Sequence, residues 1–223
     1  METTSIMETK PQLEAVSLFS CPLFITEKPE FLDVARKTSK KFIDRRKEQC
    51  NLNPIYPVYM TESINYDPEM QEFSNLVAQM AWDILDSQGY AMDGFTTYFT
   101  EMWTQEHHKM SLMEKHIHGN GAVISGFYFL DVPKDSSRVI FHHPNDAKVI
   151  TNLPERNIED VTHASNMINF VPKEGQLMFT NSWLPHSFTK NESKKPLRFI
   201  HFNIAVAQTQ QNQCCEKPQV EVI

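Results

Sequence analysis

Three histidines are the residues whose types and spacing could do chemistry in this chain. His116 and His118 stand two places apart in the segment KHIHGNG, and the apolar run AVISGFYFL follows them. Residues two places apart in a β-strand face the same side, so the two imidazoles can point together at one metal ion. Imidazole suits iron, zinc, copper and nickel. Because such pairs also arise by chance at exposed positions, the pair alone does not decide between a metal site and a surface feature.

His186 and Arg198 extend the candidate site into the C-terminal half of the chain. His186 lies just past an apolar strand that ends at Trp183, and we expect a short loop to lean it toward the histidine pair. Arg198 opens the following apolar strand. A charged side chain is costly to bury unless it meets an opposite charge, and a planar guanidinium fits a carboxylate. Arg198 is therefore either a binding residue for an anion or an exposed residue at a sheet edge.

Two helices and several strands must position these residues. Apolar residues at helical spacing predict helices over residues 28–49 and 67–88, each with a proline in its first turn. From about residue 94 the apolar period changes to two, which indicates strands. The predicted strands are 17–25, 94–105, 121–133, 137–144, 167–181 and 196–207. Short strands behind two helices favour a mainly β fold, a sandwich or an open barrel, with both helices packed on one outer face.

Composition narrows the function classes. The 223 residues include 21 Lys and Arg against 28 Asp and Glu, so the net charge is −7 and nucleic acid is an unexpected partner. The four cysteines are too few and too irregular for a disulfide framework, and no run of about 18 apolar residues could span a membrane. We expect a cytoplasmic protein with a tail at 1–16, one domain over 17–207 and a tail at 208–223.

The order of these motifs resembles a known enzyme family. HxH, then SGFYF, then EGQLMFTNSWLPH, then RFIHFN is similar to the iron(II)/2-oxoglutarate-dependent oxygenases, and most of all to a prolyl-hydroxylase-like subgroup of bacteria and marine phages. The resemblance covers roughly residues 17–206. It implies a double-stranded β-helix (jelly-roll) core with helices outside, and the use of Fe(II), 2-oxoglutarate and O₂. It also implies oxidative decarboxylation of 2-oxoglutarate coupled to hydroxylation of a peptide or small-molecule substrate.

The resemblance assigns roles to individual residues. The first metal ligand falls on His116, the distal one on His186, and the arginine that binds 2-oxoglutarate on Arg198. The family's usual second ligand is Asp or Glu, whereas this chain has His118 at that place. The resemblance therefore implies a three-histidine centre, unless His118 stands behind the ligands and a carboxylate comes from elsewhere. Tyr128 is a candidate hydrogen-bond donor to the cosubstrate if its face of the strand turns inward.

Two other function classes remain open from the sequence. Three histidines could hold zinc in a hydrolase or lyase, with metal-bound water as the nucleophile. The fold could also be a non-catalytic jelly-roll module with incidental histidines. The long polar segment 144–169 is predicted to be a rim or lid, and it does not reveal a substrate. Surface or core roles are predicted for the remaining histidines, which are His107, His108, His142, His143, His163 and His201.

Overall fold

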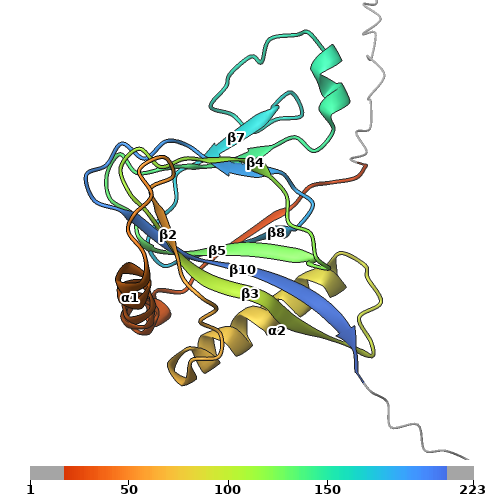
Figure 1. Cartoon of the computed structure of the whole chain (residues 1–223). Helices are drawn as coiled ribbons and strands as arrows, with labels where there is room; N and C mark the ends of the chain where they lie inside the picture. The colour runs from red at the N-terminus through yellow and green to blue at the C-terminus, as the bar shows by residue number, and fades with distance from the viewer. Residues whose placement is uncertain (1–17, 210–223) are drawn as a thin grey trace, which may run out of the picture.

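Two antiparallel β-sheets face each other in this protein (Figure 1). The computed structural model describes residues 18–209, so the predicted tail at 1–16 and most of that at 208–223 lie outside the described residues. The six-stranded sheet has the order β1-β8-β5-β10-β3-β2, and the four-stranded sheet has the order β4-β9-β6-β7. The strands are β1 (Leu23–Glu27), β2 (Val58–Met60), β3 (Phe95–His107), β4 (Met113–His116), β5 (Ile124–Asp131), β6 (Val139–His142), β7 (Met167–Phe170), β8 (Gln176–Asn181), β9 (His186–Phe188) and β10 (Leu197–Gln208).

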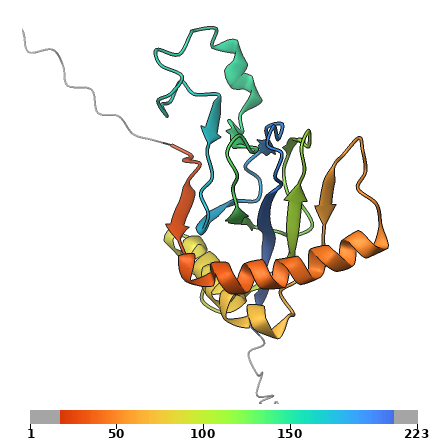
Figure 2. The same cartoon turned by 90° about the vertical axis from the view of Figure 1, so that its left-hand side faces the viewer.

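Both long helices pack on the outer face of the six-stranded sheet. These are α1 (Leu32–Gln49) and α2 (Gln71–Ser87), and α1 runs across the strands rather than along them (Figure 2). A short 3₁₀ turn that begins with proline precedes each helix, and Asp67 caps the second by accepting a hydrogen bond from the Glu69 amide at 3.0 Å. The predicted jelly-roll class with two helices on one outer face is confirmed.

The alternation of side chains along β10 separates two hydrophobic cores. Ile200, Phe202 and Ile204 belong to the core beneath the helices. Leu197 and Phe199 belong to the core between the two sheets. Because side chains of a strand alternate between its faces, both faces of β10 are buried, and apolar content alone cannot tell which residues point at the space between the sheets.

The strands that carry the histidines differ from their predicted form. β4 ends at His116, so His118 lies beyond the strand, and its backbone N–H donates to the Ser182 carbonyl at 3.0 Å. His186 opens β9, whereas a loop was predicted there. The predicted strand 167–181 is two strands, β7 and β8, separated by a turn at Gly175. Within the described residues, no helix is long and apolar enough to cross a membrane.

Candidate metal centre

The structure brings His116, His118 and His186 together between the two sheets. His116 and His186 are direct partners in the β4–β9 pairing, and His118 reaches the same point from the segment after β4. One ring nitrogen from each histidine lies within 4.8 Å of the others, and the Nε2 atoms of His118 and His186 are 3.2 Å apart. Two donor atoms that are each about 2.1 Å from one metal ion lie at most about 4.2 Å apart, so the group would have to contract to hold an ion.

Hydrogen bonds from the outer ring nitrogens orient two of the imidazoles. His116 Nδ1 is 2.8 Å from the Glu114 carbonyl oxygen, and His186 Nδ1 is 3.1 Å from the Leu184 carbonyl oxygen. A carbonyl can only accept, so each Nδ1 carries the proton and each Nε2 has a free lone pair. Metal-binding histidines are commonly oriented in this way.

Asn203 holds the third imidazole. Its amide lies 3.3 Å from His118 Nδ1 and is itself fixed by Ser125 Oγ at 2.7 Å and Glu101 Oε2 at 3.0 Å. Metal binding through Nε2 of His118 requires the proton on Nδ1. As placed, Asn203 Nδ2 donates to Glu101 Oε2 and faces His118 Nδ1, so the neutral His118 carries its proton on Nε2 and must change tautomer before Nε2 can bind a metal.

Burial keeps two imidazoles of the centre neutral. Burial, followed by the neighbouring His116 and His118, lowers the pKa of His186 to about 3. Burial, followed by His116, lowers the pKa of His118 to about 4. Neutral imidazole is the form that binds a metal, so both ligand atoms are available at pH 7 without loss of a proton. This set of nitrogen donors fits iron, zinc, copper or nickel, and the group contains no carboxylate.

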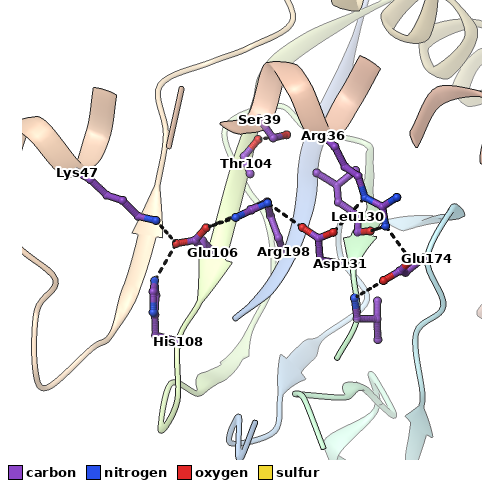
Figure 3. Close-up of polar contacts among 11 residues, drawn as sticks. Arg36, Ser39, Lys47, Thr104, Glu106, His108, Leu130, Asp131, Glu174 and Arg198 are labelled. Atoms are coloured by element: carbon purple, nitrogen blue, oxygen red, sulfur yellow. Dashed lines mark hydrogen bonds and ion pairs between the residues drawn. The ribbon is translucent and has the colours of Figure 1, made fainter. Parts of the chain in front are cut away.

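Arg198 does not join the histidines. Its side chain lies on the face of β10 that looks toward α1, where Nε and Nη2 donate to Glu106 Oε2 at 3.1 and 2.6 Å and Nη1 donates to Asp131 Oδ2 at 2.8 Å (Figure 3). The resemblance assigns 2-oxoglutarate binding to Arg198, whereas in the structure its guanidinium binds Glu106 and Asp131 and does not face the three histidines. The physical reason is the parity of the strand, because a shift of one residue moves a side chain to the opposite face.

Arg198 is instead the centre of an ion network between the six-stranded sheet and α1 (Figure 3). Glu106 is fully buried and also accepts from Lys47 at 2.7 Å and His108 at 2.8 Å. Although burial opposes it, these hydrogen bonds and that from Arg198 lower the pKa of Glu106 to about 2. On the other side, Asp131 accepts from Arg36 at 3.0 Å. The anion that Arg198 meets is therefore part of the protein.

Tyr128 also lies on the helix side of the six-stranded sheet. Its hydroxyl donates to the Lys28 carbonyl oxygen at 2.6 Å, and its ring packs 4.8 Å from that of Phe73 in α2. Burial raises the pKa of Tyr128. The structure therefore places Tyr128 away from the histidines, while its neighbour Phe127 packs against His186 at 5.3 Å between ring centroids.

Three residues near the centre were missed from the sequence as functional candidates. His201 is buried and lies 4.6 Å from His118 between ring centroids, Trp103 lies 4.9 Å from His201, and Asn203 contacts His118. The spacing of His201 and Asn203 could have revealed them, because two polar residues two places apart on an apolar strand share one face. An inward-facing Arg198, which the resemblance implies, would turn His201 to the opposite face of the strand.

A cavity of about 500 Å³ opens at the edge between β1 and β7, and none of the three histidines of the centre lines it. Phe141, the direct partner of His186 in the β6–β9 pairing, forms part of its wall, and so does Leu184. The segment between β6 and β7, which projects beyond the four-stranded sheet (Figure 1), contributes residues 161–163, 165 and 166. The predicted rim segment thus does line a cavity.

Comparison with known proteins agrees with this arrangement. A family model described as a putative 2OG-Fe(II) oxygenase matches residues 101–203, the part that carries the three histidines and Arg198. No protein with a curated description matches the chain.

Solved structures share the fold at low sequence identity. AviO1 from Streptomyces viridochromogenes is 13% identical with a TM-score of 0.59, over 83% of this chain and 90% of that one. A Pseudomonas putida prolyl-4-hydroxylase is 10% identical with a TM-score of 0.54, over 82% and 92%. HygX from Streptomyces hygroscopicus, with nickel, 2-oxoglutarate and hygromycin B bound, is 9% identical with a TM-score of 0.54, over 82% of each chain.

The family match spans β3 to β10, and the fold and the cluster of three histidines are consistent with it. Residues 101–203 therefore match the 2OG-Fe(II) oxygenase family, and this match indicates an oxidoreductase that uses Fe(II), 2-oxoglutarate and O₂.

Proposed function

We propose that His116, His118 and His186 hold Fe(II) as a three-histidine centre, and that the enzyme hydroxylates a peptide or small molecule. The observation that carries the proposal is the convergence of three imidazoles whose ring nitrogens lie within 4.8 Å of one another, with two of those imidazoles held neutral by burial. When bound, Fe(II), 2-oxoglutarate and O₂ supply the oxidant for hydroxylation of a C–H bond, as 2-oxoglutarate loses CO₂ to give succinate.

The residues of the chain fix the geometry and exclude water. The Glu114 and Leu184 carbonyls and the Asn203 amide hold the three rings in position. Phe127 and Phe141 pack against His186 and keep its surroundings dry. Three neutral ligands leave the 2+ charge of Fe(II) without a protein counter-charge. A dianionic cosubstrate offsets that charge, so the donor set and 2-oxoglutarate complement each other.

We place the substrate in the cavity beside β1 and β7. The support is its position against Phe141 and Leu184, which contact or orient His186, and its volume, which suits a small molecule or a side chain of a peptide. No Lys, Arg, Asp or Glu is among its lining residues. The lining includes His142, His143 and His163, and we propose that the part of the substrate that enters is uncharged. Segment 144–169 would form the outer rim.

Metal analysis combined with a 2-oxoglutarate turnover assay tests the function. The anaerobically prepared protein should bind one Fe(II) per chain and convert 2-oxoglutarate to succinate, and His186→Ala should lose both properties. A zinc hydrolase would bind zinc and leave 2-oxoglutarate unchanged. A non-catalytic module would bind neither, and either result would overturn the proposal. We also propose a cytoplasmic location; within residues 18–209, Cys21 and Cys50 form no disulfide, as is usual in a reducing compartment.

A further inference from the structure

The position of Arg198 leaves the cosubstrate without its expected partner. Among residues 18–209 no lysine or arginine is buried, and Arg198 is engaged by Glu106 and Asp131 on the helix side of the sheet. A keto acid that chelates a metal between the sheets needs hydrogen-bond donors there. The structure offers such donors at another place.

We propose that the imidazole of His201 and the indole N–H of Trp103 bind a carboxylate of 2-oxoglutarate, in place of an arginine. This inference rests on the proposed function, because it concerns the same metal centre. It assigns a cosubstrate-binding role to two residues on the inner face of the six-stranded sheet, one on β10 and one on β3.

Unpartnered polar atoms mark this position. Both ring nitrogens of His201 and Nε1 of Trp103 are buried and have no hydrogen-bond partner. A buried polar group without a partner is destabilising, so proteins rarely retain several together without a use. Trp82 offers a contrast within the same chain, because its Nε1 donates to the Phe95 carbonyl oxygen at 3.0 Å.

The two side chains lie next to each other and next to the metal centre. Trp103 and His201 are direct partners in the β3–β10 pairing, with ring centroids 4.9 Å apart. His201 also lies 4.6 Å from His118 between ring centroids. A ligand that chelates a metal held by His118 would therefore meet His201 first and Trp103 beyond it.

The interior farther along β10 is closed to the cosubstrate. Phe199 is fully buried and stacks on Phe188 at 4.8 Å between ring centroids, and Leu197 is fully buried beside it. These apolar residues occupy the inner-face positions that precede His201 on the strand. The carboxylate is thus directed across the sheet toward β3, rather than along β10 toward Arg198.

Neutral donors in place of a guanidinium have a consequence for affinity. Each N–H donates one hydrogen bond without supplying a positive charge, whereas an arginine supplies two parallel charge-assisted bonds. The metal then provides the main electrostatic attraction for the cosubstrate. Binding of 2-oxoglutarate should therefore be weak in the absence of metal and should increase strongly when metal is bound.

Binding measurements on the full chain test this inference. With Ni²⁺ in place of iron to prevent turnover, titration calorimetry should give a dissociation constant for 2-oxoglutarate that rises about tenfold or more in His201→Phe and in Trp103→Phe, since a hydrogen bond to a charged group contributes about 1.5–3 kcal/mol. Ni²⁺ affinity should stay within about threefold of the parent. His201→Gln, which keeps an N–H donor, should recover part of the lost affinity. Trp82→Phe and Arg198→Lys are the matched controls and should leave 2-oxoglutarate affinity unchanged.

An NMR signature separates direct contact from loss of structure. The Nε1 proton of Trp103, identified by its absence in Trp103→Phe, should move downfield when 2-oxoglutarate binds to the Ni²⁺ form, while that of Trp82 stays in place. If the parent binds both ligands but the Trp103 proton does not move and both phenylalanine variants keep parental affinity, the inference is wrong and the proposed function stands. If the parent binds Ni²⁺ or Fe(II) but no 2-oxoglutarate, both are wrong.

Discussion

At the scale of single residues, the charge at position 118 decides how the proposed centre would hold iron. His118 is neutral because burial lowers its pKa to about 4, so as a proposed ligand it would attract Fe(II) only through a lone pair. An Asp at this position would add a negative charge inside a partly desolvated pocket, where electrostatic attraction is stronger than in water.

The first prediction concerns this charge. His118→Asp should bind Fe(II) at least as tightly as the parent, whereas His118→Ala should lose about tenfold or more in affinity, because one of three ligands is removed. Anaerobic titration with Fe(II), followed by competition with a chelator, measures both variants.

The two variants together decide the role of position 118. Parental iron affinity in both would mean that His118 is not a ligand. Loss of iron affinity in both variants would mean that the site requires imidazole itself. If only His118→Asp retains iron affinity, position 118 is a ligand position that accepts either side chain.

The second prediction concerns Arg198. Arg198→Met should lower the free energy of unfolding by about 3 kcal/mol, because the fully buried Glu106 loses its closest cation. The folded variant should keep its affinity for 2-oxoglutarate, since Arg198 lies on the helix side of the sheet. Urea unfolding and calorimetry measure the two quantities, with Arg198→Lys as the charge-conserving control. A large loss of 2-oxoglutarate affinity with unchanged stability would contradict this assignment.

At the scale of elements, the register of β5 against β10 and β8 depends on a glycine. A Cβ added at Gly126 would stand 2.2 Å from the Phe202 ring and 2.4 Å from the Met178 carbonyl oxygen. Phe202 belongs to the core beneath the helices, so this close approach lets β10 bring its aromatic ring under β5. Only glycine provides the space for that ring.

The third prediction follows from this contact. Gly126→Ala should destabilise the protein by about 1–3 kcal/mol, the usual cost of overpacking a core. Gly119→Ala is the matched control, because nothing lies within 4 Å of an added Cβ there, and it should change stability little. Thermal or urea unfolding of the two variants gives the comparison. Equal stability of both variants would show that β5 can shift without cost.

The elements also explain which features were predictable from sequence. The helices were predictable because their apolar stripes repeat at helical spacing, and Phe73, Val77 and Ala81 are indeed buried. Which face of β10 points inward was not predictable, because both faces are buried. Phe199 lies on one face and Ile200 on the other, and both side chains are fully buried. Without an alternation of polar and apolar residues, the orientation of Arg198 and His201 depends on packing that the sequence alone does not reveal.

At the scale of the whole molecule, several buried histidines make the fold sensitive to acid. Burial, followed by the neighbouring His108, lowers the pKa of His107 to about 3, and burial also lowers the pKa of His201 well below its ordinary value. The unfolded chain therefore takes up protons at higher pH than the folded one. Their contribution to stability is complete above about pH 6.5 and is lost as the pH falls toward 3.

The fourth prediction is a steep acid dependence of stability in the metal-free protein. The free energy of unfolding should fall as the pH decreases from 7.5 to 5, and His107→Gln should reduce this slope by up to about 1.4 kcal/mol per pH unit, the value for one proton. Urea unfolding at a series of pH values provides the measurement. A free energy of unfolding that does not change over this range would contradict neutral burial of these histidines.

The alternation along β10 has a consequence for how the protein can change. Arg198 and His201 stand three residues apart on one strand, yet one faces the ion network with α1 and the other faces His118. Substitutions at odd and even positions of this strand therefore act on different properties. Substitutions on the helix side alter the stability of the fold, and substitutions on the inner side alter the surroundings of His118. Selection can thus adjust the two independently within a dozen residues of sequence.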